Sequence, residues 1–446
     1  MRIRIFLIAA LAAWAIVPAR AQEVPPSTTA QPSTLTSTLT LSEALQRALA
    51  ANPGLARARG EIAVAEAQLD QTRSAVLPKV SLSGNLTRNS DEASFGSGSD
   101  ERTLLPLTDW SYRLTVSQPI WAGNRDRRAL AQSRLGIENA RQGAQDTEEQ
   151  LLLNVAADYL SVVEAEQLIA VEQSNLDLAR RRQKQATDLF EAGETTRVEA
   201  LRAESDVKAA ERRLAEVRQQ RENAVGRLRL DLALDGPLSV TDPAGEVPAP
   251  PTEQALLIEA DRSRPEVAQA QTALEVARLE VAKQRGALLP VVTGEGGWVD
   301  QKSPFPTDTY GYLTLRVNVP LYQGGEVAAR VETARERQRQ AELRLAEVRQ
   351  QVREEVRQAL VDLETSRASL ALSQEQLNAA QAEYTQASEL YRAQEITALE
   401  AESAETSLAA ARRAVVTSNI NLRIAQLRVW SAAGVLKNSL FPEDAR

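Results

Sequence analysis

The stretch YRLTVSQPIWAGNRDRRALAQSR, residues 112–134, changes character at one proline. Before Pro119, polar and apolar residues alternate, which is the period of a strand with one apolar face. After Pro119 the residues become charged and rich in alanine, a composition that favours a helix. Because proline ends strand pairing but is accepted near the start of a helix, the sequence predicts a strand-to-helix junction at this point.

The same transition occurs a second time, in YLTLRVNVPLYQGGEVAARVETA, residues 312–334. Pro119 and Pro320 are 201 residues apart, and LFEAGETT recurs as LYRAQEIT at the same spacing. Upstream, Pro53 recurs as Pro265 at a spacing of 212 residues. The difference in spacing falls in a loop, where length varies at little cost. The sequence therefore predicts two copies of one structural unit.

These landmarks divide the chain into six segments. A basic start, an apolar run and an Ala-Arg-Ala site predict a signal peptide, and a Pro/Ser/Thr-rich stretch after it predicts a disordered tether. A Pro/Gly-rich linker separates the copies. The expected segments are the signal peptide (1–21), the tether (22–40), the first repeat (41–234), the linker (235–252), the second repeat (253–434) and a C-terminal tail (435–446).

Each copy is expected to contain a helix, a strand hairpin, a very long helix, a turn and a further helix. The expected strands are residues 80–88, 110–118, 291–299 and 310–319. The expected long helices are residues 122–192 and 324–393, and the shorter ones are residues 53–77, 195–233, 265–289 and 397–432. Each long helix would span roughly 105 Å at 1.5 Å per residue, which is too long for one globular domain.

The hairpins carry an apolar face, a polar face and many of the aromatic residues. This alternation is typical of a membrane barrel around water, although a half-buried soluble sheet shows it too. Four strands cannot enclose a water-filled pore, and open sheet edges are not tolerated in lipid. Three copies sharing one barrel would supply twelve strands. The aromatic residues expected at the membrane interface are Trp110, Trp121, Trp298, Tyr310 and Tyr322.

Composition argues against several classes of function. The chain has no cysteine and no histidine, so thiolate chemistry and the commonest metal ligand and general base are missing. Its glycine-rich segments lack the Lys-Ser/Thr pair of a phosphate-binding loop. A net charge of −8 disfavours nucleic-acid binding. We expect no catalytic, cofactor or metal site and no nucleic-acid partner.

Both junctions, the Leu-Pro entries to the strands at Pro78 and Pro290, and the turn LFEAGETTRVEALRAESDVKAAERRL together resemble the TolC-type outer-membrane efflux proteins. The resemblance implies a mixed, mainly α fold in which a long α-helical barrel continues a trimeric, 12-stranded transmembrane β-barrel. It also implies a homotrimer in the outer membrane of a Gram-negative bacterium, with a large periplasmic part.

The function that this resemblance implies is an exit duct for efflux or type I secretion, passing small molecules or proteins. Its implied partners are outer-membrane lipid, a periplasmic adaptor (membrane fusion protein) and an inner-membrane pump of the RND, ABC or MFS type. The alternative is a periplasmic coiled-coil adaptor or scaffold without a pore, which would not explain the two amphipathic hairpins.

The resemblance further implies that the helix turns farthest from the membrane contact the adaptor. These turns are Gly193, Glu194, Thr195 and Thr196 in the first copy, and Gln394, Glu395, Ile396 and Thr397 in the second.

A periplasmic gate lined by acidic side chains is also implied. Its candidates are Glu400 and, in the first copy, Glu199, while the family's second acidic position falls on Ser403. Glu402 and Glu405 lie nearby but on another side of the helix. Three symmetry-related Glu400 carboxylates would attract cations and raise one another's pKa. The plainer interpretation of Glu400 is an ordinary surface charge.

Overall fold

The structure is a computed structural model that describes residues 38–96, 102–242, 250–302, 308–393 and 395–441. The expected signal peptide (1–21), residues 22–37 of the tether, Gln394 and the last five residues of the tail lie outside the described residues. No helix in the described part of the chain is both long and apolar enough to cross a membrane.

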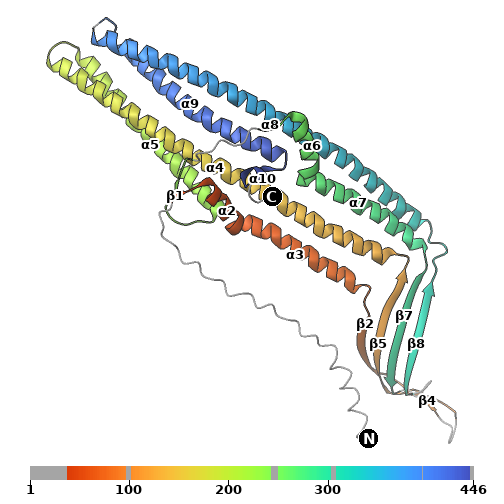
Figure 1. Cartoon of the computed structure of the whole chain (residues 1–446). Coiled ribbons are helices and arrows are strands. Elements are labelled where there is room, and N and C mark those ends of the chain that lie inside the picture. The colour runs from red at the N-terminus through yellow and green to blue at the C-terminus, as the bar shows by residue number, and fades with distance from the viewer. Residues whose placement is uncertain (1–37, 97–101, 243–249, 303–307, 394, 442–446) are drawn as a thin grey trace.

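Two long helices run the length of the molecule, from a small sheet at one end to two turns at the other (Figure 1). They are α4 (Arg125–Glu191) and α8 (Glu326–Arg392), each of 67 residues, or about 100 Å. This confirms the two long helices that the sequence predicts. Their bounds differ by 201 residues, so the helices occupy equivalent places in the two copies.

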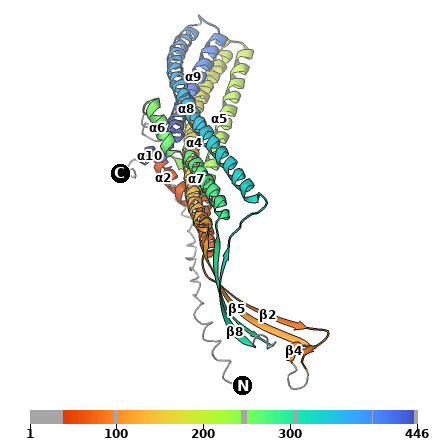
Figure 2. The same ribbon diagram turned by 90° about the vertical axis from the view of Figure 1, so that its right-hand side faces the viewer.

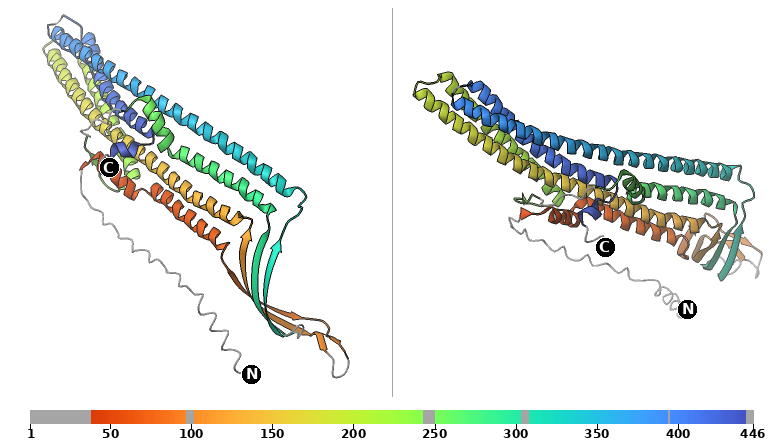
Figure 3. Two further views of the ribbon diagram at one scale, coloured as in Figure 1. Left: turned by 45° about the vertical axis from the view of Figure 1, so that its right-hand side comes forward. Right: turned by 45° about the horizontal axis from the view of Figure 1, so that its top comes forward.

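Shorter helices lie end to end beside each long one. In the half next to the sheet, α3 (Pro53–Ser74) packs on α4, and α7 (Pro265–Arg285) packs on α8. In the far half, α5 (Arg197–Leu232) and α9 (Ala398–Ala432) fold back on the same two helices. Near the middle lie α2 (Leu41–Ala51), α6 (Glu253–Ser263) and the short α10 (Leu436–Leu440) (Figure 3).

The breaks between α2 and α3 and between α6 and α7 have one cause. Pro53 and Pro265 each occupy the first turn of the following helix, and the residues before them are extended, with ψ near 122° at Asn52 and 121° at Arg264. A residue before proline is sterically kept out of the helical region. Asn52 also caps α3, because its Oδ1 accepts hydrogen bonds from two backbone N–H groups.

The sheet contains four antiparallel strands in the order β2-β5-β7-β8. They are β2 (Lys79–Arg88), β5 (Thr108–Ala122), β7 (Val291–Gln301) and β8 (Thr309–Asn318). Both predicted hairpins are therefore present, and β5 pairs with β7 to join them. The sheet curves away from the helices (Figure 2). The connection between β2 and β5 contains a further small hairpin of β3 (Ala93–Phe95) and β4 (Arg102–Leu105).

One prediction about the junctions is wrong for the first copy. Pro119 does not end its strand, because β5 continues to Ala122, with Pro119 opposite Thr293 and Trp121 opposite Val292. A register irregularity between Pro119 and Trp121 accommodates the proline. In the second copy β8 does end at Asn318, before Pro320. The difference is that β7 supplies a partner for the end of β5.

The junction in the first copy requires glycine at two contacting positions. Gly123 has a φ of +64°, and a Cβ on it would lie 2.3 Å from the carbonyl oxygen of Gly286. A Cβ on Gly286 would lie 2.6 Å from the carbonyl oxygen of Gly123. The end of α7 and the start of α4 thus approach more closely than any other residue type allows.

The largest apolar core among the described residues lies in the middle of the molecule. It contains Tyr159 of α4, whose side chain is fully buried. Its hydroxyl oxygen lies 2.8 Å from the carbonyl of Leu39 and accepts a hydrogen bond from the backbone N–H of Thr241. Leu39 is the last residue of β1 (Thr38–Leu39) and Thr241 follows β6 (Ser239–Val240), and these two strands pair in parallel. β1 therefore lies inside the expected tether (22–40).

Candidate functional site

The two faces of the sheet differ in chemistry. Leu114 of β5 lies opposite Leu82 of β2 and Trp298 of β7, so these three residues share one face. The apolar face comprises Val80, Leu82, Leu86, Tyr112, Leu114, Val116, Trp298, Leu313, Leu315 and Val317, all exposed. The other face comprises Ser81, Ser83, Asn85, Arg113, Thr115, Thr293, Glu295, Thr314 and Arg316. One face thus suits lipid, and the other suits water.

The aromatic residues expected at an interface do not all lie on the apolar face. Trp110 and Trp298 do, and Tyr322 is 86% exposed just beyond β8. Trp121 lies at the end of β5, opposite Val292. Tyr310 pairs with Val299 on the polar face. Alternation along β8 leaves no other face for a residue three positions before Leu313.

Tyr312 shares this polar face and is held there by two contacts. Its hydroxyl donates to Oε1 of Glu295 at 2.8 Å. Its ring covers Gly297, where an added Cβ would lie 2.5 Å from the ring. The polar face of the sheet is therefore partly filled by tyrosine rather than lined by short side chains alone.

The two turns at the far end share one backbone hydrogen bond. Glu194 N–H donates to the carbonyl of Leu189, and Glu395 N–H donates to that of Leu390, both at 2.9 Å. Gly193 has a φ of +76°, as the end of such a helix requires. The equivalent Gln394 lies outside the described residues. Glu194, Thr196, Glu395 and Thr397 are exposed, and Thr195 and Ile396 are half-buried.

Glu400 forms a capping box with Thr397 at the start of α9. Its Oε2 accepts from the backbone N–H of Thr397 at 2.8 Å, and its own N–H donates to Oγ1 of Thr397 at 3.3 Å. The hydrogen bonds that the backbone N–H and the Oγ1 hydroxyl of Thr397 donate to its carboxylate lower the pKa of Glu400. The Thr-x-x-Glu spacing could have indicated this role from the sequence.

Glu199, the equivalent residue in α5, makes different contacts. It accepts hydrogen bonds from Oγ1 of Thr195 at 2.6 Å and from the hydroxyl of Tyr391 at 3.3 Å. Tyr391 belongs to α8, so Glu199 links the two turns. Burial and the nearby Glu199 carboxylate raise the pKa of Tyr391.

Arg182 of α4 connects three carboxylates and was not among the sequence-predicted residues. Its guanidinium lies 3.7 Å from Asp206 of α5, 3.4 Å from Glu402 of α9 and 3.6 Å from Glu405 of α9. Burial raises the pKa of Asp206 and of Glu405. As the helical spacing predicts, Glu402 and Glu405 are not on the side of Glu400.

The contact between α4 and α9 is polar over the far half of the molecule. We call this contact the polar seam, comprising the Arg182 cluster, the pair of Glu172 with Arg413, and the pair of Glu164 with Thr417. Glu172 is 1% exposed and lies 3.0 Å from Arg413. Glu164 accepts from Thr417 at 2.8 Å.

On either side of the polar seam, each helix pair has its own apolar core. Leu176, Val207 and Leu214 pack between α4 and α5, while Ala380 and Leu408 pack between α8 and α9. The far ends of the two helix hairpins, α4 with α5 and α8 with α9, are therefore separate apolar units joined by charged and polar contacts.

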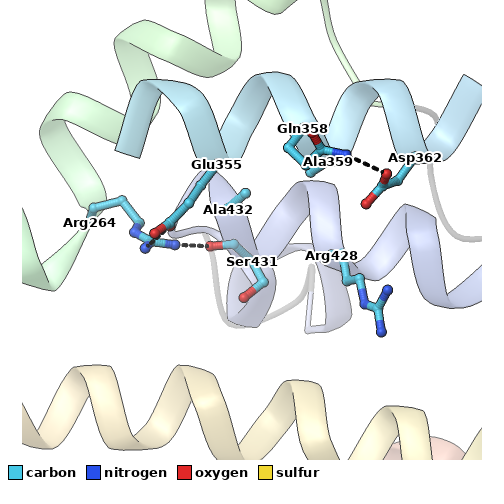
Figure 4. A pocket seen from close by; sticks show the side chains of 8 residues that line it. All are labelled: Arg264, Glu355, Gln358, Ala359, Asp362, Arg428, Ser431 and Ala432. Carbon is cyan, nitrogen blue, oxygen red and sulfur yellow. Dashed lines mark hydrogen bonds and ion pairs between the residues drawn. The ribbon is translucent and has the colours of Figure 1, made fainter. Parts of the chain in front are cut away.

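Figure 4 shows an open pocket where α7 begins beside α8 and α9. Arg264 donates to the carbonyl of Ser431 at 3.2 Å and to Glu355 at 2.6 Å, and therefore ties the three helices together. The described residues contain no group of three or more metal-ligating side chains placed to hold a metal ion. The pocket is explained by helix packing.

A family model described as "Outer membrane efflux protein" matches residues 44–233 and 256–435. These two segments coincide with the two structural repeats.

Among curated relatives, the outer membrane efflux protein BepC of Brucella suis is 24% identical over 400 residues, covering 89% of this chain and 85% of the relative. The outer membrane protein TolC of Escherichia coli is 24% identical over 426 residues, covering 91% and 84%. The alkaline protease secretion protein AprF of Pseudomonas aeruginosa is 27% identical over 286 residues, covering 59% and 57%.

Solved structures share the fold at lower identity. The chain superposes on CusC with a TM-score of 0.77 at 19% identity, covering 88% of this chain and 92% of that one. The outer-membrane channel CmeC of Campylobacter jejuni gives a TM-score of 0.73 at 18% identity, covering 89% and 85%.

Proposed function

The chain belongs to the outer membrane efflux protein family, and from this premise we propose that three copies form the outer-membrane exit duct of a tripartite efflux or type I secretion system. The observation that carries the proposal is the four-stranded sheet, which has one apolar face, one polar face and a long helical extension. Four strands cannot enclose water, whereas twelve can. Outer-membrane lipid would contact the apolar face.

Mass measurement and conductance test this proposal together. Detergent-solubilised protein should have the mass of a trimer and should conduct ions in planar bilayers. A monomer with intact strands would contradict it. The second candidate, a periplasmic coiled-coil scaffold, predicts that the protein fractionates with the periplasm and that its electrophoretic mobility does not change on heating.

The proposed partners are a periplasmic adaptor and, through it, an inner-membrane pump of the RND, ABC or MFS type. The exposed turns around Glu194 and Glu395 would receive the adaptor, since they lie farthest from the sheet (Figure 1). The cysteine-free chain allows disulfide trapping. With a cysteine introduced at the docking end of the adaptor, Glu194→Cys or Glu395→Cys should form a disulfide with it under oxidation, whereas Asp235→Cys near the linker should not. The reverse result would refute the assignment.

We place the gate of this duct at the far end of the two helix hairpins. The polar seam supports the proposal, because hairpins with separate apolar cores can move apart without exposing either core. Opening would break the ion pairs of Arg182 with Glu402 and Glu405 and of Glu172 with Arg413, while the apolar core of each helix hairpin would stay buried. Glu400 would face the opening while its carboxylate also caps α9.

We propose no catalytic role for the duct. The chain has no cysteine or histidine to act as nucleophile or general base. The inner-membrane pump would supply the energy for transport. The lumen would pass cargo without transforming it.

A further inference from the structure

We infer that Tyr312 sets the bore of the duct at its sheet end, and that Gly297 and Glu295 keep this bore wide by holding the tyrosine ring against the sheet. The inference rests on the proposed duct, in which the polar face of the sheet lines the lumen. It adds a residue that determines the size of the cargo inside the barrel, far from the gate.

Tyr312 lies in the middle of the polar face. It is directly opposite Gly297 of β7, which in turn is opposite Thr115 of β5. Arg113 lies one row closer to the ends of the strands that point away from the helices, and Arg316 lies two rows closer to the helices (Figure 1). Side chains on one face of a sheet all project to the same side. A tyrosine ring that stood upright at this height would therefore point into the lumen.

Gly297 leaves the space that the Tyr312 ring occupies. A Cβ at this position would lie 2.5 Å from Cε1 and 2.6 Å from Cζ of the ring, so the ring would have to move. The φ of Gly297 lies outside the left-handed region, so the backbone alone does not require glycine here. Glycine weakens the interior of a strand and marks places where another group approaches closely. The group that approaches Gly297 is the tyrosine ring.

The hydroxyl of Tyr312 anchors the far end of the ring. It donates to Oε1 of Glu295 at 2.8 Å, and Oγ1 of Thr115 lies 3.5 Å from it. These partners belong to β7 and β5, so the ring extends sideways from β8 across one strand toward the next. Tyr312 is accordingly half-buried, whereas Thr314 and Arg316 on the same face of β8 are exposed.

Releasing the ring would narrow the duct. The backbone of the sheet blocks movement toward the apolar face, so a displaced Tyr312 ring swings into the lumen. In a trimer, three such rings would project at one height. The diameter of a pore and the groups that line it govern which molecules pass. Gly297 and Glu295 are therefore positioning residues, and Tyr312 is the residue that limits size.

A purely structural role of the same contact can be separated, because the sheet contains a second tyrosine over a glycine. Aromatic side chains that cover strand glycines help to pin a sheet. Tyr112 of β5 lies opposite Gly84 of β2 on the apolar face, and a Cβ on Gly84 would lie 3.1 Å from Cδ1 of that ring. Gly84→Ala thus disturbs a matched pair that faces lipid instead of the lumen.

Labelling of a single introduced cysteine tests the inference in the cysteine-free chain. Intact cells are treated with membrane-impermeant thiol reagents that carry polyethylene glycol of increasing size. A reagent that enters from outside must pass Tyr312 to reach Arg316→Cys but not to reach Arg113→Cys. Gly297→Ala should slow the reaction of large reagents with Arg316→Cys several-fold and leave that with Arg113→Cys unchanged. Gly84→Ala should change neither rate.

Removing the ring tests whether the ring is the obstacle. Gly297→Ala combined with Tyr312→Ser should restore the labelling of Arg316→Cys at least to the rate without these two changes. Tyr312→Phe lacks the hydroxyl that Glu295 holds and should slow the large reagents in the same direction as Gly297→Ala. This variant adds no bulk, and it decides the question if Gly297→Ala does not assemble.

The possible outcomes separate this inference from the proposed function. Unchanged labelling in trimers that carry Gly297→Ala, equal slowing at Arg113→Cys, or a double variant that stays slow would overturn the role of Tyr312 and leave the duct intact. If Gly297→Ala does not assemble, an unchanged rate in Tyr312→Phe would overturn it. If Arg316→Cys reacts with no reagent in cells but reacts in the denatured protein, the polar face does not line an open lumen, and both proposals fail.

Discussion

Glu400 combines two roles that one substitution can separate. Glutamine at this position can still reach the backbone N–H of Thr397, so Glu400→Gln should keep the capping box while removing the charge. If three copies form a ring at the gate, Glu400→Gln should reduce the preference for cations and weaken block by divalent cations. Reversal potentials in planar bilayers measure this.

The matched control for Glu400 is Glu375→Gln, which removes an exposed charge from α8 and should leave selectivity unchanged. If Glu400→Gln also leaves selectivity and block unchanged in folded trimers, the carboxylate serves α9 alone. The low pKa of Glu400 within one chain opposes the upward shift expected from a ring, so pH-dependent selectivity would report which influence dominates.

Asp231 should make the protein less stable as pH rises. Burial and the neighbouring Asp158 carboxylate raise its pKa to about 6, whereas an unfolded aspartate titrates near 3.9. Between these values the folded state binds more protons, so the free energy of unfolding falls with rising pH. The cost at pH 7 should be about 1 kcal/mol, after allowing for solvent screening of a half-buried group.

Asp231→Asn should therefore raise the thermal stability at pH 7 and flatten its dependence between pH 4 and 6. Thermal unfolding at pH 4, 5, 6 and 7 measures both effects. Asp188→Asn, at an exposed position on the neighbouring helix α4, is the control and should change neither. A slope unchanged by Asp231→Asn would contradict the assignment.

At the scale of elements, the polar seam should determine how easily the two helix hairpins separate. Arg182→Ala leaves Glu402, Glu405 and Asp206 without their shared cation. The loss should weaken the hairpin contact by about 2 kcal/mol, between the values typical of exposed and buried ion pairs. Single-channel recordings should show more frequent or larger openings.

Arg180→Ala is the matched control for Arg182. Arg180 also lies on α4, but it pairs with Glu211 of α5, within one hairpin. Its loss should leave conductance unchanged. The effect of Arg182→Ala should shrink at low pH, because Asp206 and Glu405 have raised pKa values and protonate first. Equal conductance changes in both variants would contradict a special role for the seam.

At the scale of the whole molecule, the two faces of the sheet should respond oppositely to charge. Leu313 is 89% exposed on the apolar face, and the adjacent Thr314 lies on the polar face. Arginine facing lipid costs about 2–4 kcal/mol near the middle of the bilayer. Leu313→Arg should therefore reduce the heat-modifiable trimer in outer-membrane fractions. Thr314→Arg should leave assembly intact, and equal loss in both variants would contradict the assigned faces.

Much of this architecture follows from the sequence alone. The 201-residue and 212-residue spacings, the alternation of the hairpins and the long alanine-rich stretches predict the repeats, the strands and the helices. These features depend on residues close together in the chain, where the helical and strand periods, proline and glycine act directly. The capping box of Thr397 and Glu400 is equally local and could have been predicted.

Only the tertiary structure decided where distant segments meet. Pairing with β7 keeps Pro119 inside its strand. Arg182 belongs to a charged run like many others until α9 places Glu402 and Glu405 beside it. The pairing of β1 with β6 is likewise non-local. These contacts join residues tens to hundreds of positions apart, and their energies depend on geometry that no local pattern encodes.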